Sequence, residues 1–180
     1  MKAIRISIQS SLRICLSVFV MSIITMTITA QTYSNKVSIG IGALYERGFD
    51  ATISAEHQSK NHNTWEYFIN GYLKWKECED CGHVCSDSFW KNYNTWSVGA
   101  AYKPCVYTGR NNHGNLRIGL SAGSNTDEFL GGVHVGYEHN YILKKGLTIF
   151  WQAKCDCIIP DTEDLFRTGI VIGIKLPTSK

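Results

Sequence analysis

The chain has 180 residues, of which 44% are hydrophobic and 12% aromatic, and its 18 basic and 15 acidic residues give a formal net charge of +3. This length suits one domain. The positive excess lies in residues 1–30, which hold three basic and no acidic residues, so the remainder is balanced at 15 against 15. No Lys/Arg cluster that could follow nucleic-acid phosphates remains, and we expect no direct nucleic-acid binding.

Residues 1–30 have the order of a secretory signal peptide. Basic residues come first, an apolar run follows over residues 14–29, and the small residue Ala30 closes it. We expect cleavage there, which leaves 31–180 as one exported domain of a Gram-negative bacterium; the alternative is an N-terminal membrane anchor. No later apolar run approaches the ~18 residues of a transmembrane helix.

The exported part shows hydrophobic alternation with a period of two. Eight such segments follow in chain order, at residues 37–45, 49–57, 64–76, 94–102, 115–123, 129–141, 146–155 and 167–176. In "TWEYFINGYLKWK", for example, Trp65, Ile69 and Leu73 fall on one face, while Glu66, Asn70 and Lys74 fall on the other. This period predicts β-strands, and no convincing helical period competes with it.

The length and number of these strands favour a membrane barrel. They exceed the roughly 5–6 residues common in soluble sheets and approach the roughly 9–11 that a tilted strand needs to cross a bilayer. An even number allows closure without a free edge. We therefore predict an all-β fold, an eight-stranded antiparallel up-and-down β-barrel of the outer membrane.

The two faces of the strands favour the same interpretation. Aromatic residues stand toward strand ends on the apolar face: Tyr45, Trp65, Trp75, Tyr102, Tyr137 and Tyr141. Such residues form the girdles of membrane barrels, and the opposite face, with charges, glycine and serine, would fill a narrow lumen. The alternative is a soluble periplasmic ligand-binding barrel, which would place its apolar face inside.

The connections predict which ends of the strands lie together. Both chain ends should emerge at one end, the periplasmic one in small barrels. The far-end connections are then residues 46–48, 77–92, 124–128 and 156–164, and the longest is Glu77–Asn92. At the near end, "PCVYTGRNNH" is long for a periplasmic turn and predicts a local hairpin or a contact.

The exported chain carries six cysteines, and "CEDCGHVC" resembles a zinc site. Its possible ligands are Cys78, Cys81, His83 and Cys85, but no second pair completes the set within the loop. An oxidising compartment favours disulfides instead. Disulfides or inert thiols, a metal site and a redox role all stay open. Cys155 and Cys157 are expected at the same barrel end as this loop, and Cys105 at the other. We predict no cofactor.

One set of residues allows an enzymatic alternative, a barrel that acts on lipid. Ser121, His134 and Glu138 fall on the polar faces of adjacent predicted strands, and catalysis would need them within hydrogen-bond reach of one another. A site in the lumen does not open sideways to lipid, so we favour an interior polar network and expect no enzyme.

Several stretches resemble the conjugative transposon protein TraO family of Bacteroides-type elements. The resemblance lies in "TAQ" at the predicted cleavage site, "WEYFINGYL", "LRIGLSAGS", "FLGGVHVGYEHNYIL", "GLTIFWQAK" and "FRTGIVIGIKLP", and covers most of residues 31–177. It implies a small envelope barrel of a conjugative DNA-transfer, type IV secretion-like apparatus. Its partners would be other conjugation proteins and outer-membrane lipid, and its role anchoring. The cysteine-rich loop Glu77–Asn92 departs from the family pattern.

Overall fold

The structure, a computed structural model, describes residues 32–45, 48–74, 94–125, 128–160 and 165–178. Nearly all of these residues lie in strands. The strands are β1 (Thr32–Leu44), β2 (Gly48–Ser59), β3 (Thr64–Lys74), β4 (Thr95–Lys103), β5 (Cys105–Thr108), β6 (Asn112–Ser124), β7 (Phe129–Ile142), β8 (Thr148–Ile159) and β9 (Phe166–Pro177). A short 3-10 helix, η1 (Lys144–Gly146), precedes β8.

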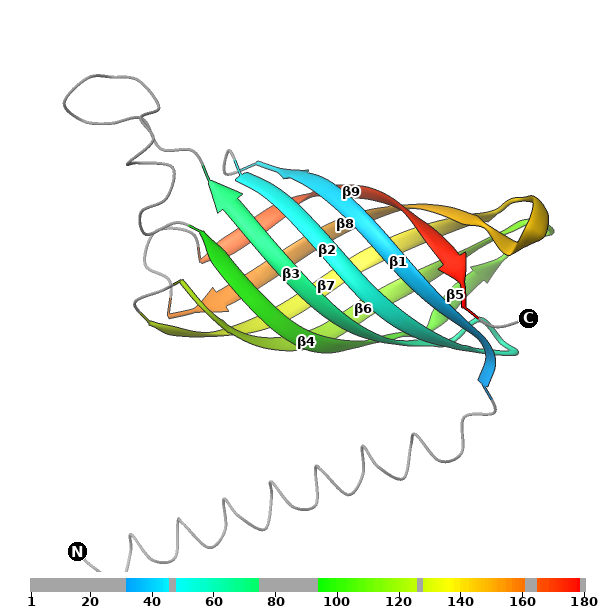
Figure 1. The fold of residues 1–180 in the computed structure, drawn as a ribbon, viewed down its shortest axis with the longest axis horizontal. Coiled ribbons are helices and arrows are strands. Elements are labelled where there is room, and N and C mark those ends of the chain that lie inside the picture. The colour runs from blue at the N-terminus through cyan, green and yellow to red at the C-terminus, as the bar shows by residue number, and fades with distance from the viewer. Residues whose placement is uncertain (1–31, 46–47, 75–93, 126–127, 161–164, 179–180) are drawn as a thin grey trace, which may run out of the picture. The chain divides into compact units, whose positions relative to one another are not determined.

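Eight of these strands form a closed antiparallel barrel (Figure 1). Each pairs with its neighbours in the chain, β1 pairs with β9, and β4 pairs with β6. Closure pairs the backbone N–H and C=O groups that an open sheet leaves without partners on its edge strands. The predicted eight-stranded up-and-down barrel is therefore confirmed.

The ninth strand, β5, is a short addition at one end of the barrel. It pairs with the start of β6 through Cys105↔Asn115 and Thr108↔His113. Its residues belong to "PCVYTGRNNH", so the predicted local hairpin is confirmed. The hairpin accommodates a connection that is longer than a tight turn needs.

The barrel has two unlike ends. We call the end where β1 begins and β9 finishes the turn end, since the connections β2–β3, β4–β6 and β7–β8 lie there. At the opposite end, the loop end, β1, β3, β6 and β8 finish and β2, β4, β7 and β9 begin (Figure 1). This assignment agrees with the predicted topology.

Along most of each strand, side chains alternate between lumen and exterior, as the period of two requires. In β2 the buried residues Asp50, Ser54 and Glu56 alternate with the exposed residues Ile53 and Ala55. The lumen is polar and the exterior apolar. This is the predicted orientation, and the inverse, soluble-barrel arrangement is wrong for this chain.

Small residues on the inner face make room for large ones. An added Cβ at Gly99 would lie 2.5 Å from the Phe68 ring and 2.4 Å from the Leu120 carbonyl oxygen. The glycine in β4 therefore leaves room for the buried side chain of Phe68, which comes from the neighbouring strand β3. The narrow interior of an eight-stranded barrel is filled in this way.

Candidate functional site

The outer surface is an apolar belt around the barrel. Its exposed aliphatic residues come from every long strand and include Ile39, Ile41, Ile53, Ile69, Val98, Leu116, Ile118, Leu120, Val133, Val135, Ile149, Ile170, Ile172 and Ile174. Within the described part of the chain, side chains such as Ile41, 55% exposed, stay largely uncovered. A contiguous apolar surface of this extent marks an interaction with lipid or protein.

Aromatic side chains flank this belt. At the turn end the ring centroids of Trp65 and Tyr102 are 5.1 Å apart, and those of Tyr137 and Trp151 are 5.6 Å apart. At the loop end the exposed aromatics are Tyr45, Phe49, Trp96, Phe129 and Phe166. The arrangement is that of aromatic girdles at two membrane interfaces. Trp75, predicted to belong to the far girdle, lies outside the described residues.

The turn-end half of the lumen is closed by a central ion cluster, which consists of Glu56, Glu66, Lys103, Arg117, Glu138 and Lys175. Lys103 Nζ lies 2.6 Å from Glu56, 2.6 Å from Glu138 and 3.2 Å from Glu66. Lys175 also contacts Glu56 and Glu138, and Arg117 Nε donates to Glu66 over 2.7 Å. Three cations balance three carboxylates.

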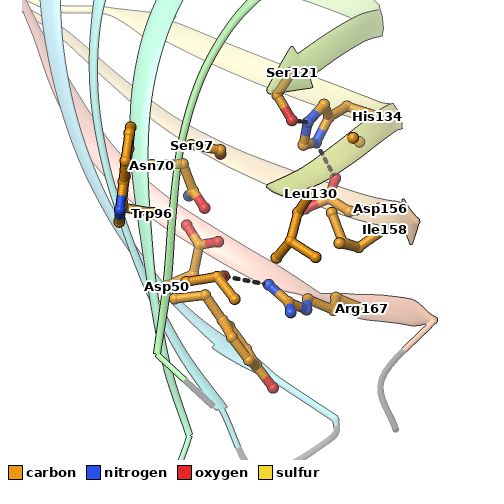
Figure 2. Close-up of a pocket in the computed structure, with 14 residues that line it drawn as sticks. Asp50, Asn70, Trp96, Ser97, Ser121, Leu130, His134, Asp156, Ile158 and Arg167 are labelled. Atoms are coloured by element: carbon orange, nitrogen blue, oxygen red, sulfur yellow. Dashed lines mark hydrogen bonds and ion pairs between the residues drawn. The ribbon is translucent and has the colours of Figure 1, made fainter. Parts of the chain in front are cut away.

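The loop-end half of the lumen holds a different arrangement, a chain of three hydrogen-bonded groups (Figure 2). The His134 ring lies between the other two: its Nε2 is 2.7 Å from Ser121 Oγ, and its Nδ1 is 2.7 Å from Asp156 Oδ1. The order hydroxyl–imidazole–carboxylate is the order of a serine-hydrolase triad. We call these residues the Ser–His–Asp chain.

Neighbouring side chains hold this arrangement in place. Lys154 bridges the second carboxylate oxygen of Asp156, at 2.7 Å, to the carboxylate of Asp50. Phe68 packs edge-on against the His134 ring, with centroids 5.1 Å apart. Both nitrogens of the imidazole and both oxygens of Asp156 therefore have defined partners, which fixes the orientation of the ring.

The Ser–His–Asp chain lines a small pocket (Figure 2). The cavity measures about 10 Å³, about the room that one water molecule needs. Its walls are polar on several sides, with Asp50, Asn70, Ser97 and Arg167. Arg167 donates to Thr95 Oγ1 over 2.6 Å and lies 3.9 Å above the Tyr72 ring.

The structure divides the three residues of the enzymatic alternative between two groups. Ser121 and His134 meet in the lumen, but Glu138 belongs to the central ion cluster, and the carboxylate on His134 is that of Asp156. The predicted connection over residues 156–164 is wrong at its start, because β8 continues through Asp156 to Ile159.

The cysteines lie at the barrel ends that the sequence predicts, Cys155 and Cys157 toward the loop end and Cys105 at the turn end. Cys157 differs from prediction in one respect: it lies with Cys155 on the outer face of the β8 wall and not in the connection that follows. With Cys105 in β5 they are free thiols. The candidate ligands Cys78, Cys81, His83 and Cys85 lie outside the described residues. Within the ranges that the structure describes, no three His, Cys, Asp or Glu side chains are grouped to hold a metal.

No helix in the described part of the chain is long and apolar enough to cross a membrane, a finding that does not bear on strands.

Comparisons with known proteins identify a fold. No protein-family model matches the chain, and no curated protein does. The crystal structure of Neisserial surface protein A (NspA) is similar with a TM-score of 0.52 at 14% identity, over 79% of this chain and 94% of that one. A chain from the de novo design of transmembrane β-barrels aligns at a TM-score of 0.49 and 10% identity, over 82% of this chain and 97% of that one. The first similarity supports the outer-membrane-type barrel fold.

Proposed function

We propose that this chain is an integral outer-membrane barrel that serves as an anchoring component of a conjugative DNA-transfer apparatus. The observation that carries the membrane part is the apolar belt between two aromatic girdles. In water this belt would expose aliphatic side chains from all eight wall strands, whereas a bilayer covers them. The proposal includes export by a cleaved signal peptide in residues 1–30.

The conjugative part of the proposal rests on the sequence resemblance to the TraO family. The lumen fits an anchor better than a conduit. Lys103 and Glu138 are each 1% exposed, and the ion pairs that they form cross the barrel between strands β4 and β7. An eight-stranded barrel with a filled interior leaves no passage for a DNA strand. In this role the belt binds outer-membrane lipid, and the barrel ends contact other conjugation proteins.

Two measurements test the two parts separately. For the membrane part, we expect the protein in the outer-membrane fraction after a carbonate wash, with Gln31 as its first residue. Recovery from the soluble periplasm would refute it. For the conjugative part, a clean deletion is expected to lower DNA transfer to a recipient, and an unchanged transfer frequency would refute it.

Complementation of the deletion tests whether DNA transfer requires the protein to be in the membrane. Wild-type protein and the conservative variant Ile41→Leu are expected to restore transfer. Ile41→Arg puts a charge in the middle of the apolar belt. We expect this variant to be lost from the membrane fraction and to fail to restore transfer. Transfer restored by a variant that does not reach the membrane would contradict anchoring as the mechanism.

A further inference from the structure

We infer that Ser121 is a nucleophile, activated by His134 and Asp156, that accepts an acyl group from a small carboxylic ester entering at the loop end. This inference goes beyond the proposed function, does not depend on it, and departs from the expectation that the barrel is not an enzyme. It rests on the geometry of the Ser–His–Asp chain, on the glycine beside it and on the pocket.

The first observation is that the hydrogen bonds determine which atoms of Ser121 and His134 carry the protons. The carboxylate of Asp156 can only accept, so His134 Nδ1 donates to it. With neutral imidazole, Nε2 then accepts from the Ser121 hydroxyl at 2.7 Å. Imidazole is thus held in the tautomer that can take the serine proton.

The second observation is that Gly132 keeps the Ser121–His134 contact open. An added Cβ at this residue would lie 2.4 Å from Ser121 Oγ and 3.1 Å from His134 Nε2. The neighbouring glycine, Gly131, is different: the nearest atom to an added Cβ is 3.7 Å away. Only the glycine that faces the Ser–His–Asp chain is sterically required there.

The third observation is the position of the pocket. Ser121 lies about 10 Å along β6 from the loop-end residue Ser124, at roughly 3.3 Å per residue. The central ion cluster closes the lumen on the other side. A substrate therefore arrives from the aqueous loop end and not sideways from lipid. The 10 Å³ cavity admits only the reacting atoms or one water, so the substrate is small or presents a narrow ester end.

The chemistry balances with an ester and water. Ser121 Oγ attacks the carbonyl carbon, its proton moves to His134 Nε2, and the C–O bond to the leaving group breaks. The leaving alkoxide takes that proton and departs as an alcohol, which leaves an acyl-serine. A water that gives its proton to the same nitrogen attacks the acyl carbon, and Ser121 recovers its proton as the acid leaves.

Methanesulfonyl fluoride, a very small serine-directed reagent, tests the nucleophile in the full-length folded barrel in detergent. The Oγ–S bond forms, the S–F bond breaks, and the proton and fluoride leave. We expect a single mass addition, located at Ser121 by peptide mapping, and release of p-nitrophenol from p-nitrophenyl acetate. Ser121→Ala should lose both. Folded wild-type protein that gains no mass at Ser121 would overturn the inference.

Two matched pairs of variants separate loss of reactivity from loss of folding. Heat-dependent migration on a gel shows whether each variant is folded. Gly132→Ala is expected to abolish labelling by turning the Ser121 hydroxyl away while the barrel stays folded; Gly131→Ala should label normally. His134→Gln should slow labelling by roughly 100-fold or more. Ser54→Ala removes another lumen hydroxyl, one that faces Ser38 at 2.6 Å and no imidazole, and should leave the rate unchanged. Equal labelling of Gly132→Ala and wild type would contradict the assigned geometry.

Discussion

Replacing Lys103 by methionine tests whether the lumen is a dry, charge-balanced interior. The ammonium group lies within 3.2 Å of three carboxylates, and its removal leaves Glu56, Glu66 and Glu138 opposite only Lys175 and Arg117. One buried negative charge is then uncompensated. Breaking a buried ion pair from one side costs about 3–5 kcal/mol, which lowers the folding equilibrium constant by roughly two to nearly four orders of magnitude.

Urea unfolding in lipid vesicles, followed by tryptophan fluorescence, measures this cost. The exposed residue Lys60 provides the control, since Lys60→Met should change the free energy of unfolding by less than about 0.5 kcal/mol. Adding Glu138→Gln to Lys103→Met restores neutrality and should recover most of the loss. A cost below about 1 kcal/mol for Lys103→Met, without rescue, would mean that water screens the lumen and would refute the reasoning.

Three further predictions concern the wall and the interior. Ile41→Arg should destabilise the barrel in vesicles by about 2–4 kcal/mol, because the exposed side chain lies in the apolar belt; a change near zero would place Ile41 outside the bilayer. Gly99→Ala should lower stability by roughly 1–3 kcal/mol through overpacking against Phe68. Gly71→Ala, which meets no atom within 4 Å, should be neutral or stabilising, and an equal loss in both variants would contradict the steric account. In planar bilayers the wild-type barrel should give no steady single-channel conductance, since the ion cluster fills the lumen; regular steps of current would show an open path.

The barrel wall could be predicted from the sequence because the alternation of apolar and polar residues can be recognised within each strand by itself. Segments such as 129–141 show in their own residues which side chains face the lumen, and β7 confirms that assignment. The end of β8 was predicted less accurately, since the strand expected over 146–155 continues to Ile159. In "KCDCII" Lys154 and Asp156 alternate with cysteines, so the period of two continues past residue 155, and the ion pair between these two side chains allows both charges in the lumen.

The enzymatic alternative placed Glu138 beside Ser121 and His134, and strand geometry excludes that carboxylate. Glu138 lies four residues further along the same strand, about 13 Å away at roughly 3.3 Å per residue, and cannot reach the imidazole. Asp156 lies directly opposite His134 on β8. Register between strands depends on turn lengths and on packing across the barrel, which a single strand does not reveal. The spacing rule alone, however, excludes Glu138.

The central ion cluster also constrains how the protein can enter a membrane. Strands β2 to β4 contribute Glu56, Glu66 and Lys103, a net charge of −1, while β6 to β9 contribute Arg117, Glu138 and Lys175, a net charge of +1. Neither half is neutral alone, and each would show its charged face to hydrocarbon if it were inserted as an open sheet. Lys175 and Glu56 are separated by 119 positions in the chain. We therefore expect insertion to be coupled to closure, with the strands crossing the bilayer together as β2 and β9 come within reach of each other.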